Sequence, residues 1–199
     1  GNSGSLGKEI IAKYGGVTAE CLCESAVKAV QYCEGFGFDD IVVSLKSADV
    51  QMNHKAHKLF AAQSDRPLHI GLTESGVGTM AELKSSAALG ALLLDEIGDT
   101  MRISLTGDPV REVILAKELL AAVGVRKRGI DFVSCPTCGR TRVDLPSIAA
   151  RVEQELQPLS EKLAKENRFI RVAVMGCEVN GPGEAASADY GVACGKGVG

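Results

Sequence analysis

The segment Asp40-Ile-Val-Val-Ser-Leu45 is a short, nearly all-apolar run, followed by a turn and then by a stretch with helical spacing. The same order recurs twice, with apolar runs at Leu68 to Leu72 and at Met101 to Leu105. Such runs are typical of parallel strands that are covered on both faces. We therefore predict three parallel strands at these positions.

Helical spacing lies before, between and after these runs. Pro109 follows Asp108, and an Asp N-cap before a proline at the first helical position is a helix start signal. The expected helices lie around Thr18 to Gly35, Asp49 to Gln63, Met80 to Glu96 and Pro109 to Val123. This alternation predicts an α/β fold, either an open doubly wound sheet or part of a (β/α)8 barrel, which periodicity alone does not separate.

The sequence pattern changes near Gly129. A predicted strand at Ile130 to Val133 runs into a cysteine pair, and a charged helix is expected from Asp144 to Glu166. Phe169 to Met175 is predicted as a buried strand that leads into a glycine-rich loop. We therefore expect a first domain of residues 1–128 and a smaller α/β domain of residues 129–199, which carries most of the candidate metal ligands.

Composition excludes several classes of function. The formal net charge of -3 offers no broad cationic surface for nucleic acid, and no apolar run approaches the roughly 20 residues of a membrane span. The N-terminus does not resemble a signal peptide, so a cytoplasmic protein without membrane or nucleic-acid partners is expected.

Seven cysteines in such a chain suggest reduced thiols that bind metal. The first residue, Gly1, and the glycine-rich last residues suggest a piece cut at both ends.

Cys135-Pro-Thr-Cys138 is a C-x-x-C pair at the end of a predicted strand, where two thiolates can converge on one metal centre. The pair by itself also resembles a zinc knuckle or a thioredoxin-like redox pair. The later cysteines, Cys177 and Cys194, do not form a second C-x-x-C, which weakens the zinc interpretation. The residues after the pair suggest a turn before any helix, which weakens the redox interpretation.

A third cysteine lies in Gly176-Cys-Glu-Val-Asn-Gly-Pro-Gly-Glu184. Two glycines around a proline predict a tight loop whose backbone can pass close to an inorganic cluster, and Glu184 can supply an oxygen ligand. Three thiolates and one carboxylate suit a [4Fe-4S] cluster with one chemically distinct iron.

Together, Ser134-Cys-Pro-Thr-Cys-Gly-Arg-Thr141 and Met175-Gly-Cys-Glu-Val-Asn-Gly-Pro-Gly-Glu184 resemble the cluster domain of the 4-hydroxy-3-methylbut-2-enyl diphosphate synthase family. The resemblance covers the whole chain, because that family joins a (β/α)8 TIM barrel to this domain, and it favours the barrel over the open sheet. It implies that Cys135, Cys138, Cys177 and Glu184 bind the [4Fe-4S] cluster. It also implies that Asn180 reaches the substrate.

The resemblance extends to the ends of the earlier strands, which read Val-Ser-Leu-Lys46, Gly-Leu-Thr73-Glu74-Ser-Gly and Arg102-Ile-Ser104-Leu-Thr-Gly. It implies that the substrate is contacted by Lys46, Thr73, Arg102 and Ser104, together with Asn2 near the start. Glu74 is implied as a catalytic group for proton handling. These positions agree with a barrel, in which functional groups lie at the carboxyl ends of the strands.

The activity implied by this resemblance is an iron-sulfur oxidoreductase of the non-mevalonate isoprenoid pathway. It opens the ring of 2-C-methyl-D-erythritol 2,4-cyclodiphosphate by two-electron reduction, with loss of water, and a ferredoxin or flavodoxin donates the electrons. Family members are homodimers in which the barrel of one subunit is capped by the cluster domain of the other. The first half of the barrel has no counterpart in this sequence, so this piece alone is expected to be inactive.

Two alternatives from other classes remain. A non-enzymatic module could hold a structural zinc with Cys135, Cys138, Cys177 and Cys194, and Cys194 could also compete with Glu184 for a cluster. A phosphosugar-binding barrel with incidental cysteines is the other. The remaining cysteines and histidines are interpreted as packing, surface or polar-core residues: Cys21, Cys23, Cys33, His54, His57 and His69.

Overall fold

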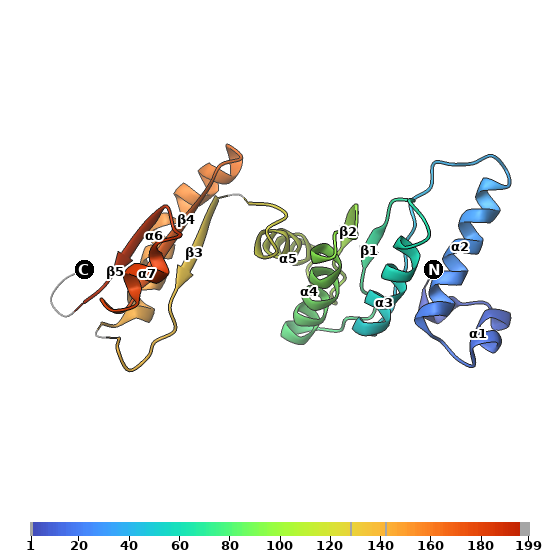
Figure 1. The fold of residues 1–199 in the computed structure, drawn as a ribbon, viewed down its shortest axis with the longest axis horizontal. Coiled ribbons are helices and arrows are strands. Elements are labelled where there is room, and N and C mark those ends of the chain that lie inside the picture. The colour runs from blue at the N-terminus through green and yellow to red at the C-terminus, as the bar shows by residue number, and fades with distance from the viewer. Residues whose placement is uncertain (1, 128, 142, 196–199) are drawn as a thin grey trace. The chain divides into compact units, whose positions relative to one another are not determined.

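The computed structural model describes residues 2–127, 129–141 and 143–195. The chain forms two compact units, Gly1–Arg126 and Lys127–Gly199. The first unit contains η1 (Ser3–Ser5), α1 (Lys8–Tyr14), α2 (Ala19–Glu34), α3 (Val50–Ala61), β1 (His69–Gly71), α4 (Gly78–Leu94), β2 (Thr100–Arg102) and α5 (Pro109–Ala122) (Figure 1). The second contains β3 (Gly129–Ser134), α6 (Leu145–Lys165), β4 (Phe169–Met175), α7 (Gly181–Ala185) and β5 (Tyr190–Ala193). The expected ranges include residues 128 and 196–199, which lie outside the described residues.

The predicted helices of the first unit are confirmed, because their start signals work locally. Thr18 caps α2 by accepting a hydrogen bond from the backbone N–H of Cys21 at 3.2 Å. Asp108 caps α5 in the same way, with the backbone N–H of Val110 at 2.9 Å, and Pro109 then begins the helix. Each cap satisfies a backbone donor that the first helical turn leaves without a partner.

The strands of the first unit are parallel, as predicted, but shorter. β1 pairs with β2 with Ile70 opposite Met101. The predicted strand Asp40 to Leu45 is present only as an isolated parallel bridge of Val43 to Leu68, while Asn2 bridges to Lys46.

Side chains alternate between the two faces of this small sheet. One face is buried against the helices and includes Val43, Leu45, Ile70, Leu72 and Ile103. We call the other face the open face; its residues are Ser44, Lys46, His69, Gly71, Thr73, Thr100, Arg102 and Ser104. Lys46 is the last residue before the turn into α3, and Arg102 ends β2. The open face therefore gathers polar side chains from three neighbouring segments.

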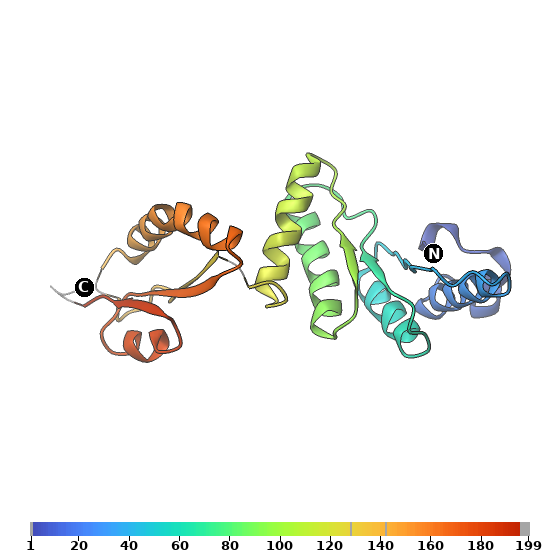
Figure 2. The same ribbon diagram turned by 90° about the horizontal axis from the view of Figure 1, so that it is seen from above.

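The second unit contains a wholly parallel sheet in the order β3-β4-β5. Ser134 lies opposite Val174, and Met175 lies opposite Ala193. Helices α6 and α7 cover opposite faces of the sheet (Figure 2). Because all strands run in one direction, the loops after β3, β4 and β5 leave from the same edge.

Four short elements were not predicted from the sequence: η1, α1, α7 and β5. They are brief, and the glycines around α7 and β5 interrupt the regular spacing of apolar residues from which helices and strands are predicted. Within the residues that the structure describes, no helix has both the length and the apolar character of a membrane span.

Candidate functional site

Three cysteines lie where the strands of the second unit end. Cys135 directly follows β3, Cys177 follows β4 after one glycine, and Cys194 directly follows β5. Cys177 and Cys194 are buried, whereas Cys135 is half-buried and Cys138 is exposed. The parallel register therefore brings thiols that are up to 59 positions apart in the sequence to one edge of the sheet.

The loop after β3 is held against the end of β4. The backbone N–H of Gly176 donates to the Sγ of Cys135 at 3.3 Å. Thr141 accepts a hydrogen bond from the backbone N–H of Cys138 at 3.0 Å, and its methyl group packs directly on Gly176. Cys135 and Cys138 are thereby both tied to the residue that precedes Cys177.

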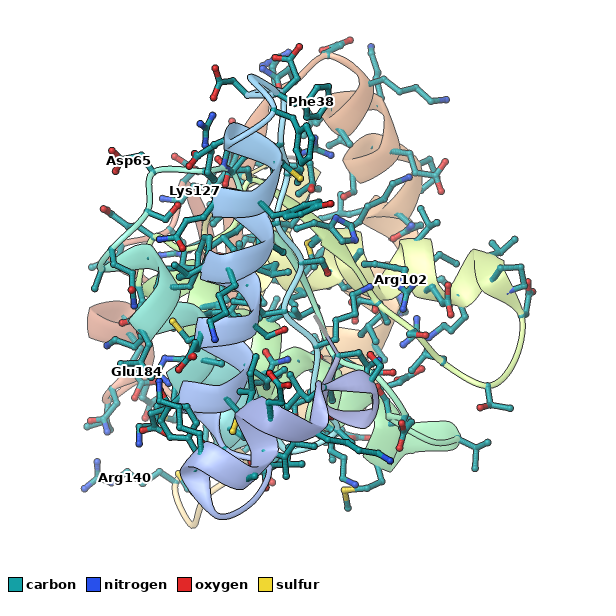
Figure 3. All side chains as sticks on the ribbon, turned by 90° about the vertical axis from the view of Figure 1, so that its right-hand side faces the viewer. Phe38, Asp65, Arg102, Lys127, Arg140 and Glu184 are labelled. Carbon is teal, nitrogen blue, oxygen red and sulfur yellow. The ribbon has the colours of Figure 1, made fainter. Side chains whose placement is uncertain are left out.

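A second link between these loops is the hydrogen bond from Nη1 of Arg140 to Oδ1 of Asn180, at 3.1 Å. Both residues are exposed, and Arg140 is labelled in Figure 3. Sequence reasoning missed Arg140. Its place between the C-x-x-C pair and Thr141 was the only available signal, and nothing local indicates that it reaches a residue 40 positions away.

Gly176 is required by this packing. A Cβ atom at this position would lie 2.9 Å from Cγ2 of Thr141 and 3.0 Å from Cδ2 of Leu145. Gly176→Ala is expected to destabilise the second unit by about 1 to 3 kcal/mol, because one of these side chains must move. Thermal unfolding measures the effect, and Gly139→Ala is the control since nothing lies within 4 Å of its Cβ position. Equal melting temperatures of the two variants would contradict the close packing at Gly176.

The Cys177 thiol lies in an environment that favours the thiolate. Backbone N–H groups of Asn180, Val179 and Gly181 lower the pKa of Cys177, while burial and the carboxylate of Glu184 oppose them. The net shift is downward. Since the thiolate is the form that binds metal, the loop before α7 favours the form of Cys177 that a metal site would need. Glu184 is exposed on α7, which follows this loop, and is labelled in Figure 3.

The donor set can be tested against the two metal centres that the sequence suggests. Among the described residues, no three His, Cys, Asp or Glu side chains lie close enough to hold one metal ion. A zinc ion needs four donors at about 2.0 to 2.3 Å from one centre, so the structural-zinc alternative gains no support. A [4Fe-4S] cluster takes each protein ligand on a different iron and accepts more widely spaced donors. Thiols on neighbouring loops and a carboxylate on α7 are donor types that suit such a cluster.

The open face of the first unit carries the predicted cations. A Cβ atom on Gly71 would lie 3.3 Å from Cε of Lys46 and 3.2 Å from the carbonyl oxygen of Arg102, so the lysine stem lies directly over this glycine. Burial, followed by repulsion from the Arg102 guanidinium, lowers the pKa of Lys46. Arg102 itself is exposed and is labelled in Figure 3. Two cations therefore lie together across β1, an arrangement suited to an anion.

The remaining predicted residues lie at the same strand ends. Thr73 and Glu74 follow β1, and Glu74 is exposed with a left-handed backbone at a φ of 56°. Such a conformation is costly for a residue other than glycine and is often found at functional sites. Ser104 follows β2. Asn2 lies beside Lys46, but its Oδ1 accepts a hydrogen bond from the backbone N–H of Gly4 and caps η1.

His69 also lies on the open face, where sequence reasoning had interpreted it only as a surface or polar-core residue. It is in β1, two residues before Gly71, and its Nδ1 lies 2.8 Å from Oγ1 of Thr100. Residues two positions apart in a strand lie on the same face, and this spacing was the signal that puts His69 on the face of Gly71. By contrast, His57 is buried within α3, and His54 is paired with Asp95.

Comparisons with known proteins cover the entire chain. Residues 1–117 match the GcpE TIM-barrel domain and residues 131–199 match the GcpE protein C-terminal domain. A relative named 4-hydroxy-3-methylbut-2-en-1-yl diphosphate synthase (flavodoxin), from Clostridium acetobutylicum, is 50% identical over 100% of this chain and 55% of its own length. The enzyme of that name from Aquifex aeolicus is 50% identical over 98% of this chain and 53% of its own length.

A third relative with the same name, from Fusobacterium nucleatum, is 48% identical over 100% of this chain and 54% of its own length. The chain thus spans about half the length of the curated relatives it matches. The matches to both domains, over more than half of the chain, agree with the resemblance in the cysteine motifs and with the parallel α/β architecture. The chain therefore belongs to the GcpE family.

Proposed function

We propose that this chain supplies the cluster ligands and part of the substrate-binding face of a 4-hydroxy-3-methylbut-2-enyl diphosphate synthase. The reaction is the reductive ring opening of 2-C-methyl-D-erythritol 2,4-cyclodiphosphate, with loss of water, in non-mevalonate isoprenoid synthesis. The names of the relatives support this activity. The observation that carries the proposal is the contact of the Cys135 thiol with the backbone N–H of Gly176, which joins the two cysteine loops.

The open face is proposed to bind the cyclic diphosphate. Lys46 and Arg102 supply positive charge, and a guanidinium can donate two parallel hydrogen bonds to a phosphate. Thr73 and Ser104 add hydroxyl donors near the strand ends. Gly71 leaves room between the cations, because a Cβ atom there would lie 3.3 Å from Cε of Lys46 and would displace the lysine stem.

The remaining site residues are proposed to orient the substrate and move protons. Glu74 is exposed at the end of β1 and is the candidate for proton handling near the leaving water. Asn180 keeps its side-chain amide nitrogen for the substrate while its Oδ1 accepts from Arg140. Asn2 keeps its amide nitrogen in the same way, since its oxygen caps η1.

Cys135, Cys138, Cys177 and Glu184 are proposed to hold a [4Fe-4S] cluster. When bound, the cluster would deliver the two electrons of the reduction one at a time. Three backbone N–H groups of the protein already lower the pKa of Cys177. The protein also provides two loops fixed to each other through Gly176 and Thr141.

The finer architecture is part of the same proposal. Residues 1–128 are assigned to the C-terminal part of a (β/α)8 barrel, and residues 129–199 to the iron-sulfur domain. The electron donor is proposed to be a flavodoxin, supported by the names of the relatives, with a ferredoxin as the alternative. A homodimer, in which the barrel of one subunit is capped by the cluster domain of the other, is proposed by analogy with the family.

Metal analysis of the protein tests the proposed function. After purification and reconstitution without oxygen, we expect about four irons and four acid-labile sulfides per chain, with a brown visible absorbance. Zinc content is measured on the same sample. Stoichiometric zinc without sulfide, persisting after reconstitution, would replace the redox proposal with a structural metal module.

A further inference from the structure

His69 lies on the open face two residues before Gly71, the residue of β1 that lies between Lys46 and Arg102. It belongs to β1, which is flanked by the segment that carries Lys46 and by β2, which carries Arg102. The contact of its Nδ1 with Oγ1 of Thr100, at 2.8 Å, fixes one ring nitrogen. The ring is only half-buried, so the Nε2 atom is the one left for a ligand on this face.

Burial and the nearby cations both favour the neutral form of the His69 imidazole. Its pKa is lowered by burial first, then by Lys46 and by Arg102. Asp99, which precedes β2, is engaged by the backbone N–H of Leu68 at 2.7 Å. On the opposite face of β1, helix α4 carries Glu82, which is paired with Arg111, and Lys84. The cations on the open face are therefore the charges that oppose protonation of the ring.

We propose that His69 is a third, proton-dependent donor to the bound diphosphate, beside Lys46 and Arg102. This inference rests on the proposed function, because it requires an anion on the open face. A diphosphate between the cations cancels their repulsion of the imidazolium. The imidazole then takes up a proton from solvent, donates Nδ1–H to Thr100 and donates Nε2–H to a phosphate oxygen.

Thr100 is compatible with both states of the ring, since a hydroxyl can donate to the neutral Nδ1 and accept from the protonated one. The direction of the pH dependence follows from linkage. The anion raises the pKa of His69, so binding takes up protons and the affinity increases as the pH falls through the bound-state pKa. The affinity that His69 adds is fully present at a pH below the pKa of the ring in the free protein. It is lost as the pH rises above the pKa of the ring in the complex.

Proton NMR of the imidazole rings tests the proposal on this chain, since it contains only three histidines. His69→Gln identifies the resonances of His69. Titration of pH with and without 2-C-methyl-D-erythritol 2,4-cyclodiphosphate is expected to raise the pKa of His69 by about one pH unit. The ligand does not titrate near neutrality, because each phosphorus has one ester and one anhydride linkage and is left with a single, strongly acidic hydroxyl. His54, paired with Asp95 away from the open face, is the internal control.

Three substitutions make the result specific. Lys46→Met is expected to raise the pKa of His69 in the free protein and to shrink the shift caused by the ligand. His69→Gln is expected to weaken binding about tenfold at a pH below both pKa values, the equivalent of a pKa change of one unit. Lys84→Met, on α4, removes the same charge elsewhere and should change neither quantity.

An unchanged pKa of His69 with ligand bound would overturn this inference. If binding still depends on Arg102 in that experiment, the proposed diphosphate site stands without His69. If the ligand perturbs no resonance of the open face, both the role of His69 and the diphosphate site fail. The cluster assignment is tested separately by iron and sulfide content.

Discussion

Cys177→Ala is expected to reduce the iron content of the anaerobically reconstituted protein from about four per chain to less than about one. The reason is that Cys177 is the buried thiol of the proposed set, with a pKa lowered by the backbone N–H groups of Val179, Asn180 and Gly181. Alanine leaves these backbone N–H groups in place but removes the sulfur atom that would bind iron. Iron and acid-labile sulfide assays measure the loss, and circular dichroism checks that the fold is kept.

Three matched variants separate ligation from a general effect of losing a polar side chain. Cys33→Ala, on α2 of the other unit, should retain about four irons. Glu184→Ala should retain the iron but abolish turnover in a full-length enzyme. Cys194→Ala should retain the iron and the turnover, because Glu184, and not Cys194, is the proposed fourth ligand of the cluster. If Cys194→Ala lost the iron and Cys177→Ala kept it, the buried thiol after β5 would be the ligand instead.

Arg102→Met is expected to raise the Kd for 2-C-methyl-D-erythritol 2,4-cyclodiphosphate by about 10- to 100-fold, the usual loss for a hydrogen bond to a charged group. Methionine preserves much of the apolar stem of the side chain but cannot donate to phosphate. It also removes a charge that lowers the pKa of Lys46. NMR titration of the open-face resonances gives the Kd, and Lys46→Met should produce a loss of the same order.

The control for Arg102→Met is Lys84→Met, which changes the net charge equally but lies exposed on α4. Its Kd should stay within about twofold of the original, because charges far from the ligand are screened at physiological salt. Equal losses of affinity in Arg102→Met and Lys84→Met would indicate that the ligand is attracted only by nonspecific charge. That result would contradict the proposed site.

The helices were predictable because their signals are local. Thr18 and Asp108 cap the helices that follow them, and Pro109 begins α5, as their residue types indicate. The buried strand Phe169 to Met175 was predicted with its observed limits, because every residue but Arg171 is apolar. The strand at Asp40 to Leu45 was overpredicted, since an apolar run reports burial but not how many neighbours complete its ladder.

The candidate ligands and substrate residues were named from motifs, and their roles stay predictions. The sequence by itself determined the family, the kinds of donor atom and the alternation of strands with helices, because these depend on residue type and short spacing. Only the tertiary structure decided which groups act on one another: the charges of Lys46 and Arg102 on His69, Arg140 on Asn180, and the backbone N–H of Gly176 on the Cys135 thiol. These interactions depend on the register between parallel strands, which joins residues 23 to 41 positions apart and leaves no local trace in the sequence.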